Sequence, residues 1–66
     1  MLLGKVKHYD INNGWGFIET LEGDDYFFNV ANLRAGQKIS LGDSVKFDVV
    51  QTQKGPSAYN IFRINP

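Results

Sequence analysis

The chain has 66 residues, no cysteine and one histidine, and its seven Lys and Arg residues balance its seven Asp and Glu residues. A chain of this size without cysteines excludes a second domain, a disulfide framework and a cysteine-ligated metal, and no apolar run approaches the roughly 20 residues of a membrane-spanning helix. We therefore expect one domain over residues 1–66, with no signal peptide, no cofactor and a cytoplasmic location.

Short runs of aromatic and β-branched residues predict β-strands along the whole chain. Residues 45–49 show the pattern best, because Val45, Phe47 and Val49 alternate with charged side chains at the period of a half-buried strand. In chain order, the predicted strands span residues 3–10, 14–20, 25–30, 45–49 and 58–64. No segment shows a useful helical period, and the best candidate is a single turn at residues 31–33.

Turn chemistry separates these strands. Residues 12–14, Asn-Asn-Gly, are typical of a tight hairpin turn, and residues 22–24 and 54–57 form further turns. The longest link, residues 33–43, joins the third strand to the fourth. This arrangement predicts an all-β fold, a small five-stranded antiparallel β-barrel, although an SH3-like barrel fits the strand count almost as well.

The most informative segment is residues 13–18, Asn-Gly-Trp-Gly-Phe-Ile. In a strand, Trp15 and Phe17 point to one face, and pairing with the next strand adds Phe27 to the same aromatic surface. Because glycine weakens a strand interior, Gly14 and Gly16 predict a bend or a close approach of another backbone. Such a surface offers a stacking platform to unpaired bases, and burial of the same rings in the core is the equal alternative.

Rings of the opposite parity are expected in the core. Tyr26 and Phe28 alternate with Phe27, and Phe28 in particular should fill the barrel interior. Parity leaves Tyr59 either as an extra ring at the rim or as core filling.

Five segments together resemble the cold-shock domain family of bacterial cold-shock proteins, which has the OB-fold. Residues 13–18 resemble the family's first nucleic-acid-binding motif, usually Lys-Gly-Phe-Gly-Phe-Ile, and residues 25–29, Asp-Tyr-Phe-Phe-Asn, resemble its second. Residues 4–7, 41–47 and 54–61 resemble its opening and closing strands. The order and spacing of all five segments carry the resemblance, since each one alone is a weak signal.

The resemblance implies a barrel that binds single-stranded RNA and DNA with little sequence selectivity, as an RNA chaperone or a regulator of transcription or translation. It implies stacking by Trp15, Phe17 and Phe27, and phosphate contacts by Lys7 and Lys54. The nucleic-acid-binding positions carried over are Lys7, His8, Tyr9, Trp15, Phe17, Phe27, Asn29 and Lys54.

The chain departs from the family at several of these positions. His8 stands where the family usually has tryptophan, and its imidazole offers less area but can change charge near neutral pH; a plain exposed histidine is the equal alternative. Asn13 replaces a lysine, and Asn29 replaces a histidine with an amide that can read base edges. Trp15, in place of phenylalanine, adds stacking area. We expect weaker binding than in a typical member.

Other functions find little support in the sequence. No cysteine nucleophile or phosphate loop is present, and we expect no catalytic residue and no enzyme activity. The acidic residues Glu19, Glu22, Asp24 and Asp25 are read as a solvated turn rather than a metal site. The alternative function is a module that binds a peptide through the same rings. A monomer is expected, with strand exchange through residues 33–43 as the alternative.

The charges are segregated along the neutral chain. Residues 1–18 carry two lysines against one aspartate, residues 19–33 carry four acids, and residues 34–66 carry five basic residues against two aspartates. We therefore expect binding to depend more on stacking than on phosphate attraction, with a modest dependence on salt.

Overall fold

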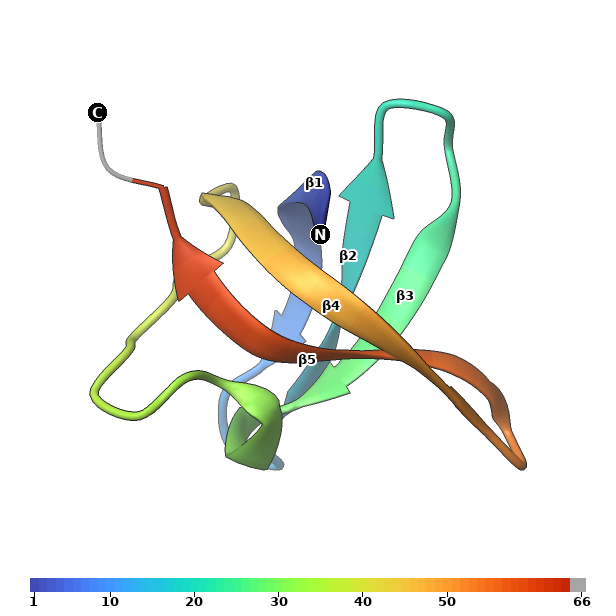
Figure 1. Cartoon of the computed structure of the whole chain (residues 1–66). Coiled ribbons are helices and arrows are strands. Elements are labelled where there is room, and N and C mark those ends of the chain that lie inside the picture. Colours follow the sequence, from blue (N-terminus) through green and yellow to red (C-terminus); the bar gives the residue numbers. More distant parts are fainter. Residues whose placement is uncertain (65–66) are drawn as a thin grey trace.

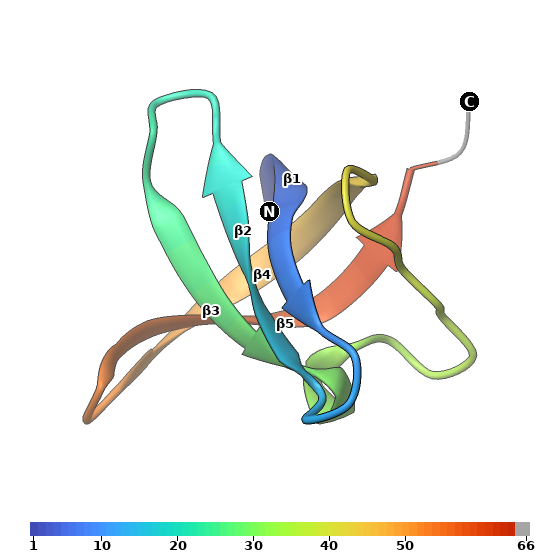
Figure 2. The ribbon, with the colours of Figure 1, turned by 180° about the vertical axis from the view of Figure 1, so that it is seen from behind.

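The structure, a computed structural model, describes residues 1–64. Its strands are β1 (Leu2–Asp10), β2 (Trp15–Thr20), β3 (Asp25–Asn29), β4 (Ser44–Thr52) and β5 (Gly55–Arg63). They close into one barrel in the order β1-β2-β3-β5-β4, with β4 and β5 nearer the viewer in Figure 1 and β1 to β3 nearer in Figure 2. The predicted small five-stranded β-barrel is confirmed.

One junction of the barrel is parallel, at the bridge between Phe27 of β3 and Ser57 of β5. The other four junctions are antiparallel. A closed ring with an odd number of strands cannot alternate in direction all the way round, so one parallel junction is required. The expectation of antiparallel pairing is corrected at this point only.

The core is filled by side chains that alternate with exposed ones along the strands. Its buried apolar residues are Val6, Ile18, Phe28, Ile39, Val45, Phe47, Ala58 and Ile61. Phe28 therefore fills the interior, as its parity predicts. Tyr26 is half-buried and packs beside Phe47, with ring centroids 5.5 Å apart. Tyr59, which parity left open, is exposed at the surface.

Two glycines allow β1 and β2 to join and to pack closely. A Cβ on Gly16 would overlap the carbonyl oxygen of His8 and lie 2.8 Å from the ring of Phe28. Gly14 ends the turn between the strands with a φ of +73°, a conformation that favours glycine. The close approach of another backbone is confirmed at Gly16, and Gly14 belongs to the tight turn predicted for residues 12–14.

The link between β3 and β4 is packed onto the barrel. It begins with a 3-10 turn, η1 (Val30–Asn32), which lies one residue before the predicted single turn. Leu33 then forms a parallel bridge with Ile61, and Ile39 is buried in the core. Across residues 1–64 the structure contains no helix with the length and apolar character needed to cross a membrane.

Candidate nucleic-acid interface

Four rings meet on the outer face of β1, β2 and β3, and we call His8, Trp15, Phe17 and Phe27 the aromatic patch. Strand pairing sets His8 opposite Phe17, and Phe17 opposite Phe27. The ring centroids lie 5.1 Å apart for His8 and Trp15, 5.9 Å for Trp15 and Phe17, 6.2 Å for Trp15 and Phe27, and 5.8 Å for Phe17 and Phe27. The predicted surface of Trp15, Phe17 and Phe27 is therefore present, and His8 extends it.

Trp15 is the centre of the aromatic patch, because it contacts the other three rings. Trp15 and Phe17 are half-buried, His8 is exposed, and Phe27 keeps 40% of its surface exposed. The rings therefore support one another while still presenting surface to solvent. This exposure rules out the alternative that they belong to the core.

A β-bulge in β1 decides which side chains face the aromatic patch. The register between β1 and β2 shifts between Val6 and His8, so that Lys7 and His8 are both exposed. Tyr9 is thereby turned inward, and its ring packs against Phe28 with centroids 5.6 Å apart. Tyr9 was predicted as an interface ring, and in this structure its half-buried ring lies behind the aromatic patch.

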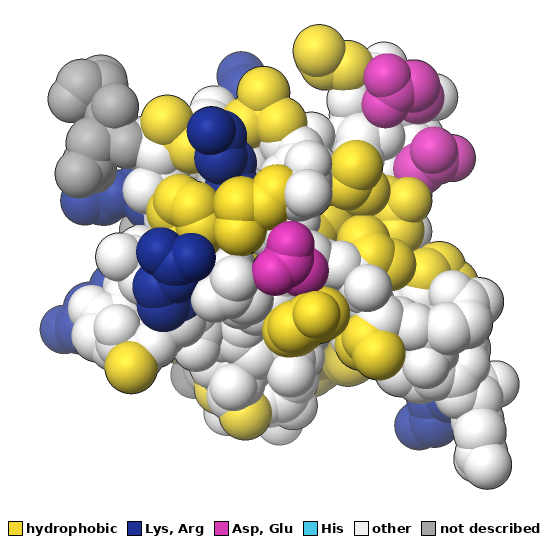
Figure 3. Space-filling model, viewed as in Figure 1, with side chains coloured by type: hydrophobic (Ala, Val, Ile, Leu, Met, Phe, Trp, Pro, Cys, Tyr) yellow, Lys and Arg dark blue, Asp and Glu magenta, His cyan; other side chains and the backbone are white. Residues whose placement is uncertain are grey.

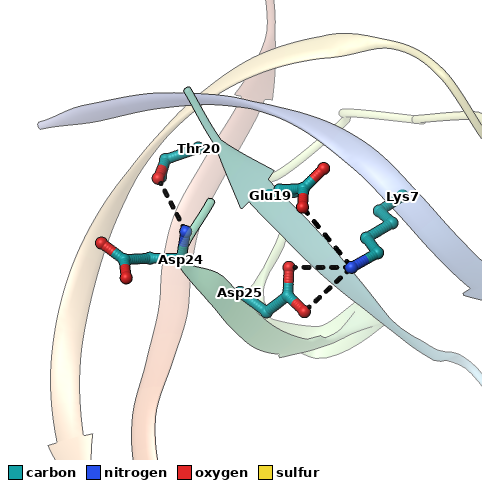
Figure 4. Close-up of polar contacts among 5 residues, drawn as sticks. All are labelled: Lys7, Glu19, Thr20, Asp24 and Asp25. Carbon is teal, nitrogen blue, oxygen red and sulfur yellow. Dashed lines mark hydrogen bonds and ion pairs between the residues drawn. The ribbon is translucent and has the colours of Figure 1, made fainter. Parts of the chain in front are cut away.

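Two carboxylates hold the ammonium group of Lys7 at one end of the aromatic patch (Figure 4). Lys7 Nζ donates to Asp25 at 3.1 Å and lies 3.5 Å from Glu19. The hydrogen bond to Asp25, followed by the charges of Asp25 and Glu19, raises the pKa of Lys7. A phosphate group at Lys7, the contact predicted from the sequence, would have to compete with these two carboxylates.

The remaining residues of the acidic turn do not join this cluster. The backbone N–H of Asp24 donates to Thr20 Oγ1 at 3.3 Å, and its carboxylate points away from Lys7 in Figure 4. Within residues 1–64, no three His, Asp or Glu side chains are arranged to hold a metal ion. The acidic turn therefore shows no metal-site geometry in this part of the chain.

Asn29 lies at the other end of the aromatic patch, opposite Trp15. Its Oδ1 accepts a hydrogen bond from the N–H of Ala31 at 2.9 Å, and the Oδ1 of Asn32 accepts one from the N–H of Asn29 at 3.0 Å. The two bonds form a capping box at the start of η1. Because its carbonyl oxygen caps η1, the Nδ2 group of Asn29 is the part of the side chain suited to a base edge.

Lys54 lies in the turn between β4 and β5, with an exposed side chain. Its backbone N–H donates to Thr52 Oγ1 at 3.2 Å. Strand β5 starts at the next residue and reaches the aromatic patch at Ser57, whose hydroxyl donates to the carbonyl oxygen of Phe27 at 3.2 Å. Lys54 therefore stands on a hairpin that projects from the Phe27 side of the patch.

Asp10 closes the turn that brings His8 and Trp15 together. Its carboxylate accepts hydrogen bonds from the side chain of Asn13 at 2.8 Å and from the backbone N–H of Asn13 at 3.1 Å. These two bonds are the main cause that lowers the pKa of Asp10, with further contributions from the Asn12 backbone and the charge of His8. Asn13, where the family usually has a lysine, is therefore a turn residue in this chain.

Comparison with known proteins agrees with this fold. The model of the family described as "'Cold-shock' DNA-binding domain" matches residues 2–64. "Cold shock-like protein CspC" of Bacillus cereus is 36% identical over 63 residues, covering 92% of this chain and 97% of the relative. "Major cold shock protein" of Streptococcus pyogenes serotype M1 is 36% identical over 66 residues, covering 97% and 98%.

A solved structure with a similar fold is described as "drosophila Unr CSD456". It superposes with a TM-score of 0.79 at 22% sequence identity, and the match covers 98% of this chain. The match spans only 27% of that longer chain. At this identity the likeness concerns the fold alone.

Proposed function

The chain belongs to the cold-shock domain family, and on this premise we propose that it binds single-stranded nucleic acid by stacking bases on the aromatic patch. The observation that carries the proposal is the position of Trp15 among three rings that keep surface exposed. Stacking of a base on such a ring contributes about 1–3 kcal/mol and depends little on which base it is. A strand laid across these rings binds with little sequence selectivity.

Polar groups at the ends of the aromatic patch would position the strand. Lys7 and Lys54 supply positive charge for phosphate groups, and the Nδ2 group of Asn29 can donate to a base edge. Tyr9 would contribute indirectly, because its packing on Phe28 supports β1, the strand that carries His8.

The cellular role that follows is that of an RNA chaperone, or of a regulator of transcription or translation, acting in the cytoplasm. A protein that binds unpaired bases, and not paired ones, shifts weak base-paired structure toward the unpaired state by mass action. We propose a monomer for this role, with strand exchange through residues 33–43 as the alternative form.

A titration with oligothymidine, followed by Trp15 fluorescence, tests the proposal. Trp15 is the only tryptophan of the chain, so quenching reports directly on the aromatic patch. We expect saturable quenching at low salt, with shifts of ¹⁵N amide resonances concentrated in β1, β2 and β3. No quenching at high oligonucleotide concentration and low salt would overturn the proposal.

Peptide binding through the same rings is the second candidate function. The observation in its favour is the ion pairing of Lys7 with Glu19 and Asp25, which reduces the positive charge beside the aromatic patch. Salt separates the two functions. Nucleic-acid binding weakens as salt rises, with a logarithmic slope of about 0.7 per phosphate contact on a single strand, whereas stacking on a peptide changes little.

A further inference from the structure

The side chain of Arg34, in the link after η1, lies over the ring of Phe62 near the end of β5. Its guanidinium carbon is 3.9 Å from the ring centroid, and its Nε donates to the Oδ1 of Asn60 at 3.1 Å. Asn60 is itself held, because its Nδ2 donates to Asp48 at 3.0 Å. Two separate contacts thus orient an exposed guanidinium group, and neither of them uses its two terminal NH₂ groups.

Further positive charge lies beside this pair. Lys46 of β4 is exposed and lies opposite Phe62 in the β4–β5 register. Figure 3 shows most of the visible Lys and Arg side chains on the side of the molecule where β4 begins and β5 ends, whereas the visible Asp and Glu side chains lie at the middle and on the opposite side of that face. Asp48 is the acidic residue near this pair. Its carboxylate accepts the hydrogen bond from Asn60 and lies 3.9 Å from the α-amino group of Met1. We call Arg34, Lys46 and Phe62 the second basic surface.

The turn η1 connects the second basic surface to the aromatic patch. At its start the N–H of Val30 donates to the carbonyl oxygen of Gly14, and just after its end the N–H of Arg34 donates to the carbonyl oxygen of Ile61. A few residues separate Val30 from Arg34, so their backbones lie at most about 14 Å apart. The second basic surface therefore begins one short turn of chain from the edge of the aromatic patch, and a strand that leaves the patch at Trp15 would pass around η1 to reach it.

We propose that the second basic surface binds the nucleotides that follow those on the aromatic patch. Arg34 and Lys46 contact their phosphate groups, and the face of the guanidinium turned away from Phe62 stacks one base. The inference rests on the proposed function and extends it, because it moves much of the phosphate attraction away from the ion-paired Lys7. Binding should then strengthen when the strand becomes longer than the aromatic patch.

The test compares two lengths of oligothymidine, about four and about twelve nucleotides, which span the usual site sizes of OB-folds. The wild type, Arg34→Gln and the matched control Lys5→Gln are titrated at several salt concentrations. We expect Arg34→Gln to weaken binding of the longer strand by about fivefold or more and to reduce its salt slope by about 0.7. Binding of the shorter strand should stay unchanged, and Lys5→Gln should affect both lengths alike.

A second measurement needs no variant and therefore does not depend on how Arg34→Gln folds. In the wild type, the amide resonances of Lys46 and Phe62 should shift with the longer strand and stay in place with the shorter one. Equal effects of Arg34→Gln and Lys5→Gln on the longer strand, or unshifted Lys46 and Phe62 resonances, would overturn the inference while leaving the proposed function intact. Failure of both strands to bind the wild type would instead overturn the proposed function.

Discussion

The backbone of His8 passes so close to Gly16 that no β-carbon fits between them. This contact brings β1 close to β2 on the strands that carry His8 and Trp15, whose ring centroids lie 5.1 Å apart. The obstacle on one side is a carbonyl oxygen, which cannot move aside as the end of a flexible side chain can.

Gly16→Ala is therefore expected to destabilise the fold. The new methyl group meets the His8 carbonyl oxygen and the buried ring of Phe28, and overpacking of this kind costs about 1–3 kcal/mol or more. Urea unfolding measures the loss. Gly23→Ala is the comparison, since a Cβ there meets nothing within 4 Å and only its φ of +88° is unfavourable. An equal loss for both variants would contradict the close contact at Gly16.

Phe27→Leu is expected to weaken binding of oligothymidine by about 1–3 kcal/mol, because one stacking ring is removed. Tyr59→Leu is a matched control, since Phe27 is 40% exposed and Tyr59 41% exposed, but Tyr59 lies outside the aromatic patch. Titration calorimetry at low salt measures both variants. If Tyr59→Leu lost as much affinity as Phe27→Leu, binding would not be located on the aromatic patch.

His8→Trp is expected to raise the affinity by about fivefold, because an indole offers more stacking area than an imidazole at a position already 5.1 Å from the Trp15 ring. Fluorescence anisotropy of a labelled oligonucleotide measures the gain without relying on tryptophan emission. His8→Gln serves as the opposite control and should lower the affinity. An unchanged affinity in both variants would place position 8 outside the interface.

Glu19→Gln is expected to strengthen nucleic-acid binding by about twofold at low salt, and by less at high salt where charges are screened. The substitution removes a negative charge beside the aromatic patch and leaves Lys7 paired with Asp25 alone. Glu22→Gln removes the same charge from the neighbouring turn and should have a smaller effect. A gain that persists at high salt would not be electrostatic in origin.

Acid should weaken the turn closed by Asp10. Since hydrogen bonds from Asn13 lower the pKa of Asp10 below its ordinary value of 3.8, the carboxylate contributes stability above that value and loses it as the pH falls through the lowered pKa. The difference in the free energy of unfolding between the wild type and Asp10→Ala should therefore shrink below about pH 4. Asn13→Ala should move this loss to higher pH, and urea unfolding across the acid range checks both variants.

Much of the fold could be predicted from local pattern. Within one strand, side chains alternate strictly, so the parity of Trp15 and Phe17 and the interior place of Phe28 follow from their positions alone. Glycine in a strand or a turn has few physical explanations. Gly14 has the positive φ of a tight turn, and Gly16 lies against the backbone of another strand. A parallel junction could also have been predicted, because five strands cannot close a ring with antiparallel junctions alone.

The missed features depend on more than one strand. Strict alternation along β1 would turn the side chain of His8 inward and that of Tyr9 outward. The bulge after Val6 reverses both orientations. A bulge arises from the pairing of two strands, so one strand alone does not reveal it. The ion pairs of Lys7 with Glu19 and Asp25 join three strands, so no single segment reveals them.

By itself, the sequence determined the strands, the turns, the membership of the family and the identity of the three central rings, since each of these follows from short-range alternation, glycine and motif spacing. Only the tertiary structure decided that His8 joins those rings, that Tyr9 does not, and that the charge of Lys7 is shared with two acids. The reason is physical: strand register and charge pairing are set where distant segments meet. The net charge of zero therefore does not describe how the charges are distributed in the fold. Lys7 beside the aromatic patch is paired with carboxylates, and a separate basic surface lies at Arg34, Lys46 and Phe62.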